Sequence, residues 1–185
     1  MTEQPQSVSP RARATGVALL GLVLVLFAAN LVWVIRNCDG LRSVGPGSAA
    51  PDFALPTLAG DRVHLKALRG RVVLIDFWSV TCAPCWDGLG HLNELQTRYA
   101  NKPVSLLAVH VQGNRRARQR AQQAAAELKL RMPVLLDTDR ISDKYTVRVL
   151  PTIVLIGKDG NIRKVWRGLT PTRTLAAAID EALEK

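Results

Sequence analysis

The feature that most constrains this chain is a near-continuous apolar run from Val72 to Trp78, followed closely by two cysteines, Cys82 and Cys85. An apolar run of this length is typical of a strand buried on both faces of a sheet. The residues from Ala83 to about 100 predict a helix, because their apolar side chains recur at helical spacing. The sequence therefore predicts that the cysteine pair lies where a buried strand passes through a short loop into a helix.

The other segments predict a layered α/β domain over residues 49–185. Residues 52–55 and 62–65 predict a hairpin around the Gly60-Asp61 turn. Thr170 and Pro171 predict the beginning of a last helix, with the threonine as its cap and the proline in its first turn. Further strands are predicted at 104–111, 134–136, 153–156 and 162–166, and further helices at 114–130 and 139–145.

The spacing of Cys82 and Cys85 points to thiol chemistry. At the beginning of a helix, unpaired backbone N–H groups and the helix dipole stabilise a thiolate, so Cys82 is the predicted nucleophile. Cys85 follows one helical turn later on the same side. It can therefore attack and resolve a mixed disulfide formed at Cys82.

The spacing alone leaves two alternatives open for the pair: a static disulfide and half of a metal site. A zinc site needs two further ligands close by, whereas His64, His91 and His110 are scattered along the chain. We assign none of these histidines a role and expect no bound metal. Two thiolates can nevertheless hold Cu(I), which keeps a copper-binding function among the alternatives.

Asp76 places a carboxylate in the middle of the predicted buried strand. Burying an ionised carboxylate is costly, so its pKa is expected to rise toward neutrality. A group tuned in this way could accept the proton of Cys85 as that thiol attacks. The alternative is that Asp76 faces a wet edge or bonds to neighbouring backbone.

Three segments together resemble one known family. DFWSVTCAPC resembles the active-site segment of the thioredoxin superfamily. APDFALPTLAGDRVHLKALRGRVVLIDFW and PVLLDTDRISDKYTVRVLPTIVLIGKDGNI are similar to segments of membrane-anchored TlpA/ResA-type thiol–disulfide oxidoreductases. The resemblance implies a three-layer α/β/α thioredoxin fold with an N-terminal β-hairpin and a central insertion. It also implies a cis peptide bond before Pro151, facing the cysteines, and pairing of the Leu150 backbone with an extended substrate.

Other positions near the motif vary from the family pattern. Thr81 stands where many members have tryptophan, and Gly88 and Thr152 stand where the cytochrome c maturation branch commonly has acidic residues. Trp86 could supply an exposed apolar element. We expect Thr81 and Trp86 to line the substrate-binding surface together with Leu150 and Pro151.

The N-terminal part predicts a membrane anchor. Residues 14–35 carry no charged side chain and, as a helix, would extend about 33 Å, enough to cross a bilayer. Arg11 and Arg13 precede the run and favour a cytoplasmic segment at 1–13. Residues 36–48 are predicted to be a flexible linker. A cleaved signal peptide fits less well, because the apolar run is long and lacks small residues at a suitable cut.

These features predict a single-pass protein of the inner (cytoplasmic) membrane whose C-terminal domain lies in the periplasm or on the outer face. The predicted activity is thiol–disulfide exchange with extracytoplasmic proteins, as a reductase fed by a membrane electron donor and needing no cofactor. Maturation of cytochrome c or of another cofactor protein is the candidate process. The alternatives are a disulfide-introducing oxidase and a Cu(I) chaperone. The net charge of +10 suits anionic partners, but nucleic acid is not expected outside the cytoplasm.

Overall fold

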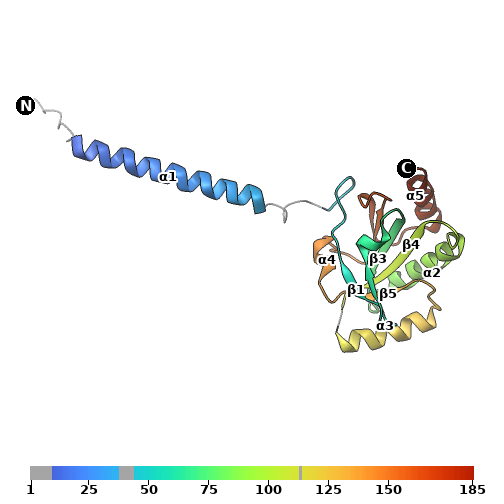
Figure 1. The fold of residues 1–185 in the computed structure, drawn as a ribbon. Helices are drawn as coiled ribbons and strands as arrows, with labels where there is room; N and C mark the ends of the chain where they lie inside the picture. The colour runs from blue at the N-terminus through green and yellow to red at the C-terminus, as the bar shows by residue number, and fades with distance from the viewer. Residues whose placement is uncertain (1–9, 38–43, 113) are drawn as a thin grey trace, which may run out of the picture. The chain divides into compact units, whose positions relative to one another are not determined.

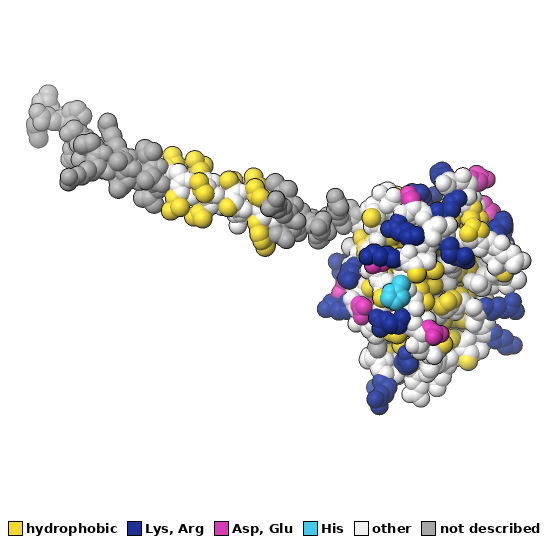
Figure 2. All heavy atoms as spheres, viewed as in Figure 1, with side chains coloured by type: hydrophobic (Ala, Val, Ile, Leu, Met, Phe, Trp, Pro, Cys, Tyr) yellow, Lys and Arg dark blue, Asp and Glu magenta, His cyan; other side chains and the backbone are white. Residues whose placement is uncertain are grey.

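The computed structural model describes residues 10–37, 44–112 and 114–185, and the chain divides into two compact units, Met1–Arg42 and Ser43–Lys185. In the first unit, helix α1 spans Pro10–Asn37. Its described side chains, those of residues 20–34, are exposed and mostly apolar (Figure 2). Within the described part of the chain, no helix combines the length and the apolarity that crossing a bilayer requires. The anchor stays a prediction, and Cys38 lies outside the described residues.

The second unit is built on a five-stranded sheet with strand order β5-β4-β3-β6-β7. The central strand β3 runs parallel to β4, from Val72 beside Val104 to Trp78 beside His110, and antiparallel to β6. All seven side chains of β3 are buried, as its apolar sequence predicts. The strands are β3 (Val72–Trp78), β4 (Val104–His110), β5 (Val134–Leu136), β6 (Thr152–Ile156) and β7 (Ile162–Arg167).

Helices cover both faces of this sheet (Figure 1). The side chains of β3 alternate, so Leu74 and Trp78 pack with helices α2 (Ala83–Arg98) and α5 (Thr172–Glu184) on one face. Ile75 and Phe77 pack on the other face, with residues of the 3₁₀ helix η2 (Leu65–Leu68) and of α4 (Ile141–Lys144). By the same alternation Asp76 belongs to the face that α2 and α5 cover.

An N-terminal hairpin closes one edge of the sheet. Strands β1 (Ala54–Pro56) and β2 (Arg62–His64) pair antiparallel, and the Leu58 N–H donates to the Val134 carbonyl on β5 at 2.9 Å. Helix α3 (Arg115–Glu127) occupies the predicted central insertion and buries a stripe of alanines, while its arginines are exposed or half-buried. The predicted layered α/β domain and its hairpin are therefore confirmed.

The predicted cap of the last helix is wrong. Helix α5 begins at Thr172, after Pro171 in an extended conformation, and no side chain caps it. The Thr170 hydroxyl donates instead to the Gly168 carbonyl at 3.2 Å. Pro171 occupies the cap position, so Thr170 lies one residue too early to cap the helix.

Candidate active site

The two cysteines lie at the junction that the sequence predicts. Strand β3 ends at Trp78, and Cys82 occupies the cap position before the first residue of α2. The Cys85 N–H donates to the Cys82 carbonyl at 3.0 Å, which forms the first turn of the helix. The two sulfur atoms are joined in a disulfide with an S–S distance of 2.07 Å.

The two sulfur-bearing residues differ in exposure. Cys82 is half-buried, whereas Cys85 is completely buried among core side chains. A disulfide or thiol from another protein can therefore reach Cys82 but not Cys85. This asymmetry agrees with Cys82 as the residue that forms the mixed disulfide and Cys85 as the residue that resolves it.

Asp76 is fully buried, and neither of its carboxylate oxygens has a hydrogen-bond partner among the described residues. Burial alone raises the pKa of this carboxyl well above its ordinary value of 3.8, as its position in the strand predicts. A methyl group placed on Gly88 of α2 would lie 3.9 Å from Asp76 Oδ2 and 3.7 Å from Leu169 Cδ1. The carboxyl thus lies under the first turns of the helix that carries both cysteines.

The peptide bond between Leu150 and Pro151 is cis, which confirms the isomer implied by the resemblance. Pro151 directly precedes β6, whose Thr152 lies beside Phe77 of β3. It therefore lies at the same edge of the sheet as the cysteine loop. Among the described residues, no hydrogen bond involves the Leu150 N–H or carbonyl. An extended polypeptide could pair with this backbone, although the binding role of Leu150 stays a prediction.

Thr81 and Trp86 hold the loop before the helix. Thr81 is exposed, and its hydroxyl oxygen lies 3.0 Å from that of Ser79. Trp86 is half-buried, and its indole N–H donates to the Val80 carbonyl at 3.3 Å. Both residues thus brace the approach to Cys82, while their contact with a substrate stays a prediction.

His110 is a residue of this site that sequence reasoning missed. It ends β4 beside Trp78 and is completely buried, with the two rings edge to face at a centroid distance of 4.9 Å. The Val80 N–H lies 3.4 Å from Nε2, and Nδ1 lies 3.0 Å from the Gln112 carbonyl. The neutral ring protonated at Nδ1 satisfies both contacts, and burial lowers the pKa of His110. The sequence does place His110 near the end of the strand predicted at 104–111. Adjacent parallel strands end at the same side of a sheet, so this position could have suggested that His110 lies near the end of β3.

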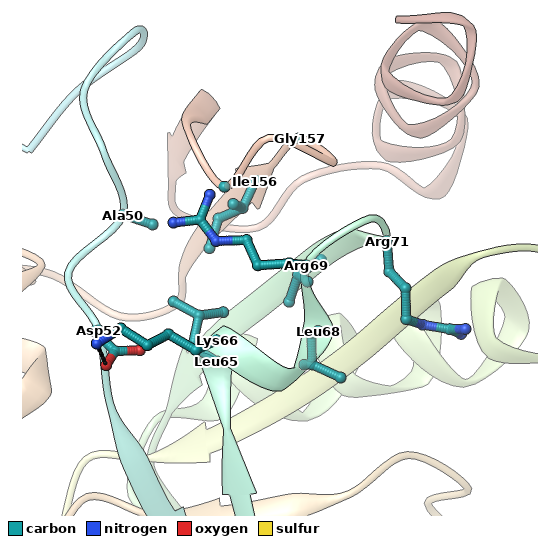
Figure 3. A pocket seen from close by; sticks show the side chains of 11 residues that line it. Ala50, Asp52, Leu65, Lys66, Leu68, Arg69, Arg71, Ile156 and Gly157 are labelled. Atoms are coloured by element: carbon teal, nitrogen blue, oxygen red, sulfur yellow. Dashed lines mark ion pairs between the residues drawn. The ribbon is translucent and has the colours of Figure 1, made fainter.

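A small pocket lies away from the cysteine pair. Figure 3 shows this pocket beside η2, where Lys66 and Asp52 form an ion pair at 3.0 Å. Val73 of β3 is among the residues that line it. Its cavity volume is about 30 Å³, room for about two water molecules. Among residues 10–37, 44–112 and 114–185, no group of three or more His, Cys, Asp or Glu side chains could hold a metal ion.

The buried carboxyl predicts a pH-dependent stability. The folded-state pKa of Asp76 is raised above 3.8. The contribution of Asp76 to the free energy of unfolding is therefore highest below pH 3.8, where this carboxyl is protonated in both states, and it decreases as pH rises through the folded-state pKa. We expect Asp76→Asn to increase the free energy of unfolding more at pH 8 than at pH 4, since each unit by which folding raises a carboxyl pKa corresponds to about 1.36 kcal/mol. Urea denaturation of the oxidised protein at both pH values measures this difference.

Asp61→Asn, in the exposed turn of the hairpin, is the matched control. We expect it to change the free energy of unfolding by less than about 0.5 kcal/mol at either pH. An equal effect of Asp76→Asn at pH 4 and pH 8 would contradict a raised pKa.

Known proteins resemble this chain in sequence and in fold. The AhpC/TSA family model matches residues 46–165. The thiol-disulfide oxidoreductase ResA of Bacillus subtilis is 34% identical over 151 residues, covering 80% of this chain and 82% of ResA. ResA of Geobacillus thermodenitrificans is 35% identical over 148 residues, covering 80% and 83%. A Chlorobium tepidum structure assigned as the thiol:disulfide interchange protein DsbE has a TM-score of 0.70 and 30% identity, covering 76% of this chain and 99% of that one. With its disulfide at a strand–helix junction, the chain therefore belongs to the AhpC/TSA family and is a thiol–disulfide oxidoreductase of the thioredoxin superfamily.

Proposed function

We propose that this protein is a membrane-tethered reductase of disulfides in extracytoplasmic proteins. The observation that carries the proposal is the pairing of a half-buried Cys82 with a buried Cys85 at the beginning of α2, beside the cis bond to Pro151. A substrate can reach the sulfur of Cys82 only, and the buried sulfur of Cys85 lies next to it. This is the arrangement that sequential disulfide exchange requires.

The exchange has two steps. In the reduced protein the Cys82 thiolate attacks one sulfur of the substrate disulfide, which forms the mixed disulfide and releases a substrate thiolate that takes up a proton. The Cys85 thiolate then attacks the Cys82 sulfur, which forms the Cys82–Cys85 bond and releases the second substrate thiol. Two electrons pass from the protein to the substrate. A membrane dithiol protein, the proposed electron donor, later returns them.

The surrounding residues serve these steps. Burial raises the pKa of Asp76, so its carboxylate form is a stronger base than an exposed one and accepts the proton of Cys85 as that thiol becomes the nucleophile. Leu150 offers an unpaired backbone N–H and carbonyl to an extended substrate. His110 and Trp86 hold Val80, so the loop that leads to Cys82 keeps one conformation.

The proposed membrane tether is supported by the N-terminal sequence. Residues 14–35 have no charged side chain, Arg11 and Arg13 precede them, and the described side chains of α1 are exposed apolar groups. Exposed apolar surface of this kind is stabilised when a bilayer covers it. The proposed location is the inner membrane, with residues 49–185 on the outer side.

Two other functions use the same cysteines. An oxidase would run the exchange in the opposite direction, and a copper chaperone would bind Cu(I) without exchange. The chain is 34% identical to a thiol-disulfide oxidoreductase over most of its length, which favours an exchange enzyme over a copper chaperone. The reductase direction is proposed from the resemblance to the TlpA/ResA-type family together with the predicted tether. Reduction of cytochrome c precursors or of other cofactor-binding proteins is the candidate process.

Replacement of each cysteine separates these functions. We expect Cys85→Ser to accumulate a mixed disulfide with a disulfide substrate such as insulin, because Cys82 still attacks but nothing resolves the product. We expect Cys82→Ser to form none at Cys85, because that thiol is buried, and any adduct at Cys38 is identified by its peptide mass. Non-reducing electrophoresis and mass spectrometry measure the adduct. Stoichiometric Cu(I) binding by the unaltered protein, with no insulin reduction and no adduct, would instead identify a chaperone.

The topology has its own test. We expect the full chain, expressed in a Gram-negative host, to stay in the membrane after alkaline carbonate extraction, and a chain beginning at residue 36 to be released. A maleimide that cannot cross the membrane should label reduced Cys82 in intact spheroplasts, and the Cys82→Ser variant controls for labelling of Cys38. Labelling of Cys82 only after lysis would place the domain on the wrong side.

A further inference from the structure

Two exposed apolar side chains lie beside the cis bond to Pro151. Among the described residues from 44 onward, Val149 and Leu169 are the only large hydrophobic side chains that are highly exposed, at 49% and 46%. Val149 precedes the Leu150–Pro151 bond, and Leu169 follows Gly168, whose N–H donates to the Pro151 carbonyl at 2.8 Å. The other described large apolar side chains of this unit are buried or half-buried, so these two residues mark a candidate contact surface.

The backbone at the same place identifies the occupant as a polypeptide. The N–H and the carbonyl of Leu150 have no hydrogen-bond partner within the described part of the chain. A strand laid beside Leu150 would satisfy both groups, and its side chains would then contact Val149 and Leu169. A lipid surface cannot supply this alternation of donor and acceptor.

Unpaired positive charge borders this surface. Arg148 adjoins Val149, and Arg167 ends β7 beside Thr152, two residues before Leu169. Both arginines are exposed, and neither guanidinium group has an ion pair or a hydrogen bond with any described residue. The segments 147–152 and 165–171 contain no acidic residue, and on the cysteine side the nearest acid along α2 is the exposed Asp87.

Two other cations of β7 form ion pairs, whereas Arg148 and Arg167 do not. Arg163 pairs with Asp159 at 3.0 Å, and Lys164 pairs with Glu181 at 2.8 Å. The far end of β7 and its α5 side thus carry balanced charges, and the uncompensated arginines lie at the end next to Pro151. Figure 2 shows how widely Lys and Arg are spread over the visible face of the domain, so a variant that lowers net charge elsewhere is an essential control.

We propose that Arg148 and Arg167 determine specificity by selecting substrates whose disulfide lies in an extended segment with acidic side chains on either side. The proposal rests on the disulfide-exchange function and adds the chemical class of its substrate. Acidic flanks would meet the two arginines while an apolar residue contacts Val149 and Leu169. Exposed ion pairs are individually weak, so the expected preference for acidic over basic flanks is about fivefold to twentyfold at low ionic strength.

The test uses the full chain in neutral detergent, reduced with a dithiol and then separated from it. Two peptides of the same length carry an identical disulfide, one with glutamates beside the cysteines and one with lysines. We expect the glutamate peptide to be reduced faster by the factor above, and the ratio to fall toward one in high salt. Arg148→Gln and Arg167→Gln should each lower the ratio, and the double variant should bring it close to one.

Lys164→Gln is the matched control, because it removes one positive charge from the same strand outside this surface. It should retain the ratio of the unaltered protein. A ratio near one in the unaltered protein, or an equal loss in Lys164→Gln, would overturn the proposal and show that only the net charge of the protein acts.

Peptide binding is also measured without disulfide exchange, so that the specificity inference can be tested separately from the exchange function. Peptides with serine in place of both cysteines report the ratio of the two dissociation constants. If hydroxyethyl disulfide and both disulfide peptides stay unreduced while the serine peptides keep the preference, the exchange function fails and the specificity inference stands. If the disulfides are reduced and neither assay shows a preference, the specificity inference fails alone.

Discussion

The structure depends on the burial of β3 on both faces. Seven consecutive buried residues fix the strand between β4 and β6, because a one-residue slip would turn each side chain to the opposite face. This register brings the end of β3, the end of β4 and the segment before β6 to one edge of the sheet. The cysteine loop, His110 and Pro151 come from those three places. The active site is therefore a consequence of how one apolar strand is packed.

The same strand explains why a carboxyl can be held without partners. Asp76 follows the alternation of its neighbours into the face under α2, where Gly88 leaves room above it. Neighbouring residues pack on both sides of the strand, so the side chain cannot turn toward water without disrupting the core. The cost of this burial falls on folding, while the raised pKa makes the carboxylate a stronger proton acceptor than an exposed one. Stability and chemistry are thus opposed at one residue.

Local patterns sufficed to predict much of this architecture. The apolar run of β3, the spacing of Cys82 and Cys85 and the turn at Gly60 each act through neighbouring residues, and the predicted strands and helices follow them closely. The cis bond before Pro151 was implied by resemblance alone, because local sequence does not determine that isomer. The role of His110 is not visible in its local sequence, because pairing of β3 with β4 brings it beside Trp78 and Val80, residues that are about 30 positions away. Thr170 has the residue type of a helix cap but lies one residue before the cap position, which Pro171 occupies. Arg148 and Arg167 stand out only in the folded structure, where Arg163 and Lys164 of β7 are paired with acids.

The central claim is that the Cys82–Cys85 pair donates electrons to other proteins. Its most direct test is the reduction potential of this pair, measured by equilibrating the full chain with glutathione buffers and trapping the free thiols by alkylation. The account predicts a value near or below about −220 mV, where a dithiol protein acts as a reductant. A value above about −150 mV, in the range of strongly oxidising pairs, would contradict the proposed direction of electron flow.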